Sequence, residues 1–133
     1  MSRVDKYDPK VGGYRATLAA DITDANLERL YGVGHDAAGH LVIGKGVTGI
    51  KAVWVWTSKL KAGKRSDTMT RGEVVEFGPT AGNPGVDFGV PGKNYYAHDD
   101  GSITATKGGD GIYIGHTVEG QRLIVDVQPG EVA

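Results

Sequence analysis

Residues 93–128 constrain the fold more than any other part of this chain, because they hold four short β-type runs separated by glycine-containing turns. Each run is rich in β-branched and aromatic residues, as strands usually are. The runs cover Tyr95–His98, Ile103–Thr106, Ile112–Glu119 and Arg122–Val127. Between them stand Asp-Asp-Gly, Gly-Gly-Asp-Gly and Glu-Gly-Gln, and glycine provides the positive φ angles of tight hairpin turns. This part of the chain predicts an antiparallel meander that carries no reactive group.

Glycine is unusually frequent over the whole chain. It accounts for 22 of the 133 residues, about twice its average share in proteins, and it shows no collagen-like period. Among alternating apolar residues, such an excess indicates many turns between short strands. We therefore expect a single all-β domain of short antiparallel strands, large enough to bury its own core. The chain has no cysteine, which excludes disulfides, thiolate metal sites and cysteine nucleophiles.

Charge and hydropathy argue against two classes of partner. The 15 basic and 16 acidic residues give a formal net charge of −1, and no block of Lys and Arg stands out. A nucleic-acid partner is therefore not expected. No run approaches the roughly 18 apolar residues of a membrane span, and the first residues lack the apolar region of a secretory signal. We expect synthesis in the cytoplasm and no membrane partner.

Residues 1–20 differ in composition from the rest and are interpreted as an extended N-terminal arm before a β domain over residues 21–133. Basic residues alternate with tyrosines there, while proline and paired glycines prevent regular structure. Tyr and Arg are frequent anchors of protein interfaces. The candidate contact residues of the arm are Arg3, Tyr7, Pro9, Tyr14 and Arg15. The alternative is a frayed terminus.

The strongest single strand prediction falls on Ile50–Thr57. Alternation places two tryptophans on one face of this strand and two valines on the other, so both faces are largely apolar. Such a strand is usually central, covered on one side by the core and on the other by a second sheet or a partner subunit. The candidate core or subunit-interface residues are Val53, Trp54, Val55 and Trp56.

The remaining elements are short. Asp21–Leu30 holds the one helical candidate, of one or two turns. The expected further hairpins pair Tyr31–His35 with Leu41–Ile43 and Asp67–Thr70 with Glu73–Phe77. Residues 78–92 are too rich in glycine and proline for a strand and too long for a hairpin turn. This loop is interpreted as a binding or contact element, with a disordered insertion as the alternative.

No residue pattern predicts catalysis or a bound metal. The histidines, His35, His40, His98 and His116, lack metal-ligand spacing and are expected to be exposed in turns or on strand faces. The sequence from His98 to Gly101 lacks the calcium-loop pattern, and a β-turn explains it more simply. There is neither a phosphate loop nor a serine elbow. We therefore expect no enzymatic activity, no cofactor and no metal.

The chain resembles the small head decoration proteins, or capsid cement proteins, of tailed bacteriophages, especially those that infect actinobacteria. The blocks that carry the resemblance are MSRVDKYDPKVGGYRATLAAD, YGVGHDAAGHLVIGKGVTGIKAVWV, KLKAGKRSDTMTRGEVVEF, YYAHDDGSITA and YIGHTVEGQRLIVDVQ. They span nearly the whole chain, but the loop at residues 78–92 does not fit the pattern. The resemblance implies a β-sandwich or barrel-like domain on the outer surface of the icosahedral capsid. It also implies a homotrimer that cross-links major capsid subunits and so stabilises the virion.

Two other function classes remain open at this point. A carbohydrate-binding or host-adhesion module could use aromatic side chains as a stacking platform for sugar rings. The candidate platform residues are Trp54, Trp56, Tyr95 and Tyr96, although aromatic residues of a central strand are more often part of the core. A small β-barrel enzyme is the third class, since residues distant in sequence can converge in space.

Overall fold

The structure is a computed structural model of the chain, and it describes residues 13–23, 29–55, 60–76, 90–118 and 122–128. The described residues contain strands and no helix, so the expected all-β class is confirmed. The strands are β1 (Arg15–Thr17), β2 (Leu30–His35), β3 (Leu41–Gly46), β4 (Ala52–Val55), β5 (Arg65–Asp67), β6 (Arg71–Glu76), β7 (Asn94–Ala97), β8 (Ile103–Thr104), β9 (Ile112–Val118) and β10 (Arg122–Asp126).

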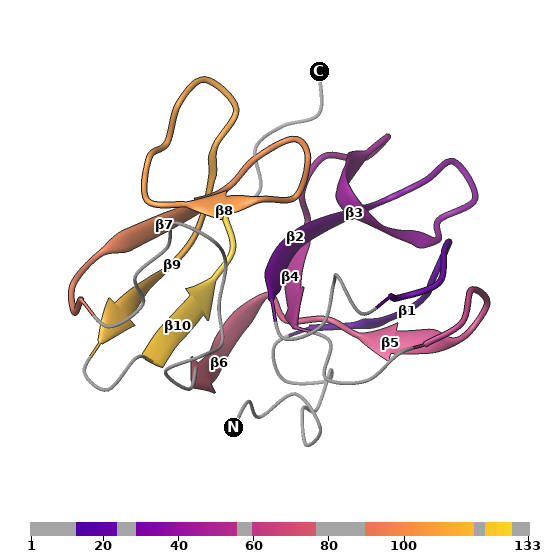
Figure 1. Cartoon of the computed structure of the whole chain (residues 1–133), viewed down its shortest axis with the longest axis horizontal. Coiled ribbons are helices and arrows are strands. Elements are labelled where there is room, and N and C mark those ends of the chain that lie inside the picture. Colours follow the sequence, from indigo (N-terminus) through magenta and orange to yellow (C-terminus); the bar gives the residue numbers. More distant parts are fainter. Residues whose placement is uncertain (1–12, 24–28, 56–59, 77–89, 119–121, 129–133) are drawn as a thin grey trace.

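These strands form three sheets. The largest has the order β6-β10-β9-β7-β8, the second has the order β3-β2-β4, and the smallest pairs β1 with β5. In Figure 1 the five-stranded sheet lies on the left, and the two smaller sheets lie together on the right. The large sheet therefore faces β2 and β4 across the core, which is the small sandwich expected for this chain.

In the meander region the predicted strands are confirmed, but their predicted order in the sheet is wrong. Each of the four runs predicted between residues 93 and 128 is a strand, and β9 and β10 form the expected hairpin, with Val118 opposite Arg122. However, β9 pairs with β7, while β8 pairs with the other edge of β7. Since the loop after β8 is long, β9 returns past it to the longer β7.

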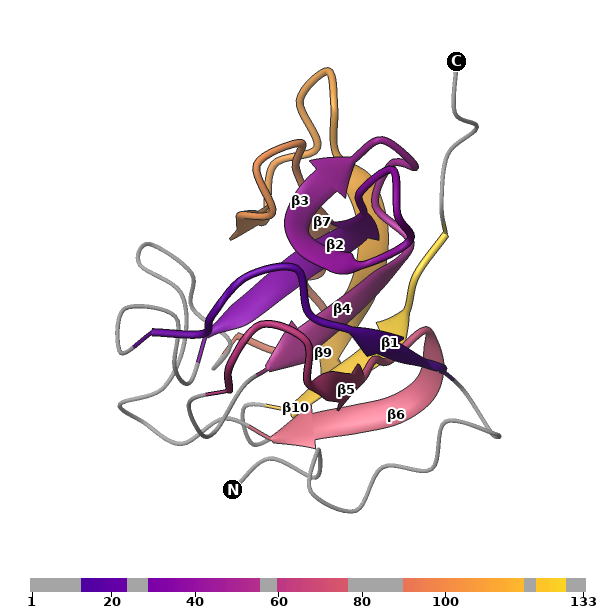
Figure 2. The same cartoon turned by 90° about the vertical axis from the view of Figure 1, so that its right-hand side faces the viewer.

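Several other local predictions are wrong. The hairpin expected between Asp67–Thr70 and Glu73–Phe77 does not form where the chain is described, because Asp67 ends β5, which pairs with β1, whereas β6 pairs with β10. The ladder between β2 and β3 is parallel with two register shifts, because β3 curls around on itself through glycines with positive φ (Figure 2). The helix expected over Asp21–Leu30 is absent where the chain is described, and Leu30 begins β2. Residues 24–28 of that prediction lie outside the described residues.

The boundary predicted for the N-terminal arm is also too late in the chain. Arg15 of β1 pairs with Asp67 of β5, and the backbone N–H of Leu18 donates to the carbonyl of Lys64 at 2.8 Å. The Leu18 side chain is 2% exposed and belongs to the core. Residues 13–20 are therefore part of the folded domain. The first twelve residues of the predicted arm lie outside the described residues.

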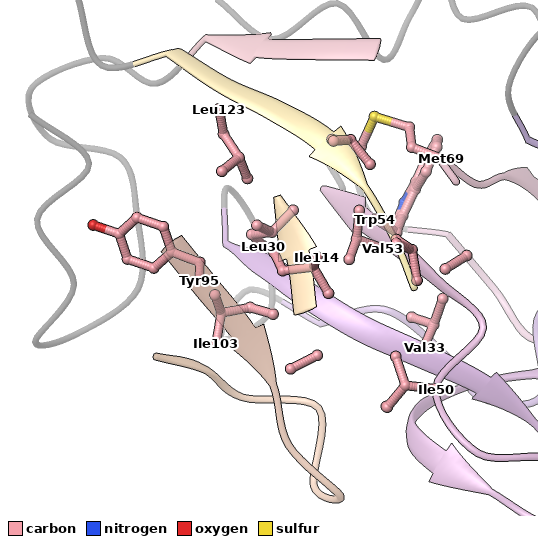
Figure 3. Packing of buried hydrophobic residues seen from close by; sticks show 14 of the residues in the cluster. Leu30, Val33, Ile50, Val53, Trp54, Met69, Tyr95, Ile103, Ile114 and Leu123 are labelled. Atoms are coloured by element: carbon pink, nitrogen blue, oxygen red, sulfur yellow. The ribbon is translucent and has the colours of Figure 1, made fainter. Parts of the chain in front are cut away.

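The core lies between the large sheet and the strands β2 and β4. Leu30 and Val53 contribute from one side, and Tyr95, Ile114 and Leu123 contribute from the other (Figure 3). All five residues are fully buried, and Tyr95 has the largest side chain among the fully buried residues of the described chain. Burying an aliphatic or aromatic side chain of this size stabilises a fold by about 1.5–3 kcal/mol.

Glycines allow the two larger sheets to meet backbone to backbone. The turn between β7 and β8 approaches β2 and β3. The N–H of Gly32 donates to the carbonyl of Gly101 at 2.9 Å, and the N–H of Lys45 donates to the carbonyl of Asp99 at 2.9 Å. A Cβ on Gly44 would lie 2.7 Å from the Asp99 oxygen. We call Gly32, Gly44 and Gly101 the glycine seam.

Candidate functional site

Tyr14 and Arg15 are the two predicted arm residues that the structure describes, and both contact the domain. The Tyr14 hydroxyl lies 2.7 Å from Nε2 of His35, and the two ring centroids are 5.5 Å apart. Burial raises the pKa of Tyr14 and outweighs the opposite effect of the Thr68 hydrogen bond. Arg15 Nε donates to Oδ1 of Asp67 at 2.7 Å, and an exposed ion pair of this kind adds little to stability. Tyr14 is thus a packing residue of this domain.

The other predicted contact and core residues are only partly described. Outside the described residues lie Arg3, Tyr7, Pro9, Trp56 and the side chain of Val55. Val53 and Trp54 project from opposite faces of β4, and both are buried. Because the chain itself covers both of these side chains, the burial of Val53 and Trp54 needs no partner subunit.

A connected group of polar side chains is centred on His98, at the turn between β7 and β8. Nδ1 of His98 lies 2.7 Å from Oδ1 of Asp110, and Nε2 lies 2.6 Å from Oγ1 of Thr104. The other carboxylate oxygen of Asp110 accepts the backbone N–H of Asp99 at 2.9 Å. These bonds hold the pKa of Asp110 below its usual value, with the Asp99 N–H as the largest cause and His98 as the second.

This group has the residue types of a hydroxyl–imidazole–carboxylate triad, but its bonds favour a structural role. In a catalytic triad the hydroxyl is free to attack a substrate and the base is free to accept its proton. Here the Thr104 hydroxyl donates to the carbonyl of Thr106 at 2.9 Å and lies 3.3 Å from the Thr106 N–H. The three side chains therefore tie the turn after β7 to the loop before β9. We call them the His98 network.

A β-bulge shapes the outer face of the large sheet. The register between β7 and β9 shifts between Tyr95 and Tyr96, and Gly115 has a φ of 146°. The extra residue turns Tyr113 and His116 to the same side although they are three apart. The Tyr113 hydroxyl lies 3.1 Å from Nδ1 of His116, and its ring meets that of Tyr96 edge-on at 6.1 Å.

This arrangement corrects the sugar-stacking platform predicted from the sequence. Trp54 and Tyr95 are buried in the core and offer no face to a sugar ring. Tyr96 is half-buried and pairs with Tyr113, which the sequence did not single out. Burial, together with the nearby Asp126 carboxylate, raises the pKa of Tyr113.

A pocket of about 220 Å³ opens between β3 and the segment that follows β1. Its floor is made of the buried side chains of Leu18, Ile22 and Leu41, which belong to the core. Ala20 and Val42 line its walls nearer the surface. Asp21 adds a carboxylate to this otherwise aliphatic lining, and its Oδ1 accepts the backbone N–H of Ala62 at 2.8 Å. The pocket offers no set of converging catalytic side chains.

The described residues contain no group of three or more His, Cys, Asp or Glu side chains that could hold a metal ion. Among the same residues, no helix is long and apolar enough to cross a membrane.

The fold is similar to that of a solved chain from Mycobacterium phage Patience. The TM-score is 0.81, the sequence identity is 24%, and the match covers 98% of this chain and 97% of that chain. No protein-family model and no curated protein matches the sequence. At this identity the likeness shows a common fold over the whole chain.

The His98 network was not predicted from the sequence. His98 lies at the turn after β7, Thr104 lies in β8, and Asp110 lies in the loop before β9. The two turns were interpreted separately, each as a hairpin connection. The available signal was the presence of Asp in both turns, since carboxylates often accept backbone N–H groups there. The distance between the two turns depends on β8, whose position at the sheet edge the sequence did not indicate.

Proposed function

We propose that this chain is a structural protein of a tailed-phage virion. It binds the outer surface of the icosahedral capsid as a homotrimer and stabilises the shell by cross-linking major capsid subunits. The observation that carries the proposal is the likeness, over almost the whole chain, to the fold of a phage chain. The resemblance of its sequence blocks to those of capsid decoration proteins supports the same function.

Three features of the molecule suit a protein that is attached to a shell. Both faces of β4 are covered by the chain itself, so the domain is folded before it meets a partner. The glycine seam fixes the two larger sheets to each other through main-chain bonds. A charge close to zero limits repulsion between neighbouring copies at high local density. In addition, several weak contacts in a symmetric oligomer act together and give firm attachment.

The test uses purified heads that lack this protein, taken from the phage that encodes it. The full chain should co-sediment with these heads and raise the temperature at which they rupture. A variant without residues 2–12 should fold normally but bind more weakly, because the predicted contact residues Arg3, Tyr7 and Pro9 are removed. Absence of co-sedimentation together with an unchanged rupture temperature would refute the proposal.

Carbohydrate binding is a second candidate, favoured by the outer face of the large sheet. Tyr96 and Tyr113 lie there beside His116. Near Tyr113, the side chain of Gln128 donates a hydrogen bond of 3.3 Å to Asp126. Aromatic rings with planar polar neighbours are suited to sugar recognition. If host-surface polysaccharide quenches the fluorescence of the full chain but not that of a Tyr113→Ala variant, this candidate gains support over capsid binding.

A further inference from the structure

Both ring nitrogens of His98 face an oxygen atom at hydrogen-bond distance. Nδ1 lies 2.7 Å from Oδ1 of Asp110, and Nε2 lies 2.6 Å from Oγ1 of Thr104. The side chain of His98 is 16% exposed, so these two oxygens rather than water are the partners of the ring. A neutral imidazole has one N–H donor and one acceptor nitrogen, whereas the charged ring has two donors. The partners therefore determine which form of the ring satisfies every bond.

The Asp110 side of the ring requires a hydrogen on Nδ1. The Asp99 N–H, and after it His98, holds the pKa of the Asp110 carboxyl below its usual value, which keeps this group ionised at neutral pH. An ionised carboxylate only accepts hydrogen bonds. Nδ1 of His98 is therefore the donor of this bond.

The Thr104 side of the ring requires a hydrogen on Nε2 as well. The hydroxyl of Thr104 has a single hydrogen, and it donates that hydrogen to the carbonyl of Thr106 at 2.9 Å. The backbone N–H of Thr106 lies 3.3 Å from the same hydroxyl oxygen and can only donate to it. Towards Nε2 the hydroxyl thus presents a lone pair. All of these bonds are made together only when His98 carries a hydrogen on both ring nitrogens.

We propose that His98 is a pH-sensitive switch for the loop between β8 and β9. In the protonated state the ring bridges the turn after β7, strand β8 and this loop. When Nε2 loses its proton it becomes an acceptor, and the Thr104 hydroxyl turns to donate to it. The Thr106 carbonyl then loses its bond to this hydroxyl, and residues 105–110, all of which are exposed, are held less firmly.

The charges that surround the ring favour its protonated state. Asp100, in the same turn, interacts electrostatically with the ring, and Asp110 contacts it from the loop before β9. Carboxylates at such positions favour the charged form of a histidine. From β3, the ammonium group of Lys45 reaches the same turn, but it pairs with Asp99 at 3.4 Å. Lys107 is the cation of the loop itself, and it is exposed to solvent, which screens its charge.

His35 provides an internal comparison, because a neutral ring satisfies both of its bonds. Its Nδ1 lies 3.1 Å from the carbonyl of Gly39, which only accepts, and its Nε2 lies 2.7 Å from the Tyr14 hydroxyl. That hydroxyl can donate to an unprotonated Nε2. The partners of His35 therefore do not require a second ring hydrogen, and its titration should not alter the loop after β8.

A nuclear magnetic resonance titration of the full chain tests the switch. As the pH rises, the nitrogen signals of the His98 ring should change from two N–H groups to one. The carbon signal of the Thr106 carbonyl should shift with the same midpoint. The N–H of Asp99, whose acceptor Asp110 belongs to the loosened loop, should exchange several-fold faster relative to the N–H of Lys45, which bonds outside the network. The titration of His35 should leave the Thr106 carbonyl unchanged.

Two variants at residue 104 isolate the contribution of the hydroxyl. Thr104→Val removes it, so the Thr106 carbonyl should no longer respond when His98 titrates. Thr104→Ser is the matched control, because it keeps the hydroxyl, and it should respond like the parent chain.

A Thr106 carbonyl that ignores the His98 titration in the parent chain, or follows it equally in Thr104→Val, would overturn the inference. A His98 ring with a single N–H at every pH at which the chain is folded would also overturn it. The parent chain decides the question even where Thr104→Val does not fold. The inference concerns the chain alone, so neither outcome depends on capsid binding.

Discussion

At the scale of single residues, glycines with similar backbone angles differ in what surrounds them. Gly39 and Gly44 have φ angles of 83° and 97°, but a Cβ at Gly39 would meet nothing within 4 Å, whereas one at Gly44 would lie 2.7 Å from Asp99 O. We expect Gly39→Ala to cost about 1 kcal/mol of unfolding free energy and Gly44→Ala about 2–4 kcal/mol. Urea denaturation of both variants measures the difference, and equal losses would show that the glycine seam is not tightly packed.

A second prediction concerns Asp110 and the loss of folding stability at acidic pH. Its pKa is lowered in the folded chain, first by the Asp99 N–H and then by His98. A carboxylate of this kind stabilises the fold above its unfolded pKa, which is about 3.9, and that contribution is lost as the pH falls through the folded pKa. Thermal melts below about pH 4 should therefore fall less steeply for Asp110→Asn than for the parent chain. Parallel acid limbs would contradict the role given to this carboxylate.

Among the elements, β1 is the first strand of the described domain. Deleting residues 2–12 should leave the melting temperature close to that of the full chain. Deleting residues 2–20 removes β1 and the buried Leu18, and loss of a buried leucine alone costs about 2–5 kcal/mol. The longer deletion should thus unfold or melt far lower, as circular dichroism would show. If the shorter deletion is equally damaging, the first twelve residues contribute to the fold.

The sequence predicts which residues form strands better than it predicts which strands pair with each other. Alternation and glycine turns are local signals, and they located β7, β9 and β10 to within a few residues. Pairing depends on loop length and on the core, so the hairpin predicted between Asp67–Thr70 and Glu73–Phe77 was wrong: β5 pairs with β1, and β6 pairs with β10. The same limit applies to the candidate sites. Tyr113 and His116 face the same way only because of a bulge, which no local composition signal marked.

At the scale of the whole molecule, one core joins the two larger sheets. Truncating Trp54 tests whether these sheets unfold together. This side chain is 7% exposed and belongs to the same cluster as Leu123 of the opposite sheet. Trp54→Ala should cost about 3–5 kcal/mol, a large part of the 5–15 kcal/mol that stabilises a typical domain. Near- and far-ultraviolet circular dichroism should lose signal together on heating. Separate transitions would mean that the sheets unfold independently.

The glycine seam has a mechanical consequence. Where Gly32 and Gly101 meet, and where Gly44 faces Asp99, main-chain atoms touch with no side chain between them that could change rotamer and give way. A load applied to one sheet therefore passes directly into the other, and the domain should deform as a single stiff body. Pulled between its two sheets in an optical trap, it should resist until it ruptures in one step.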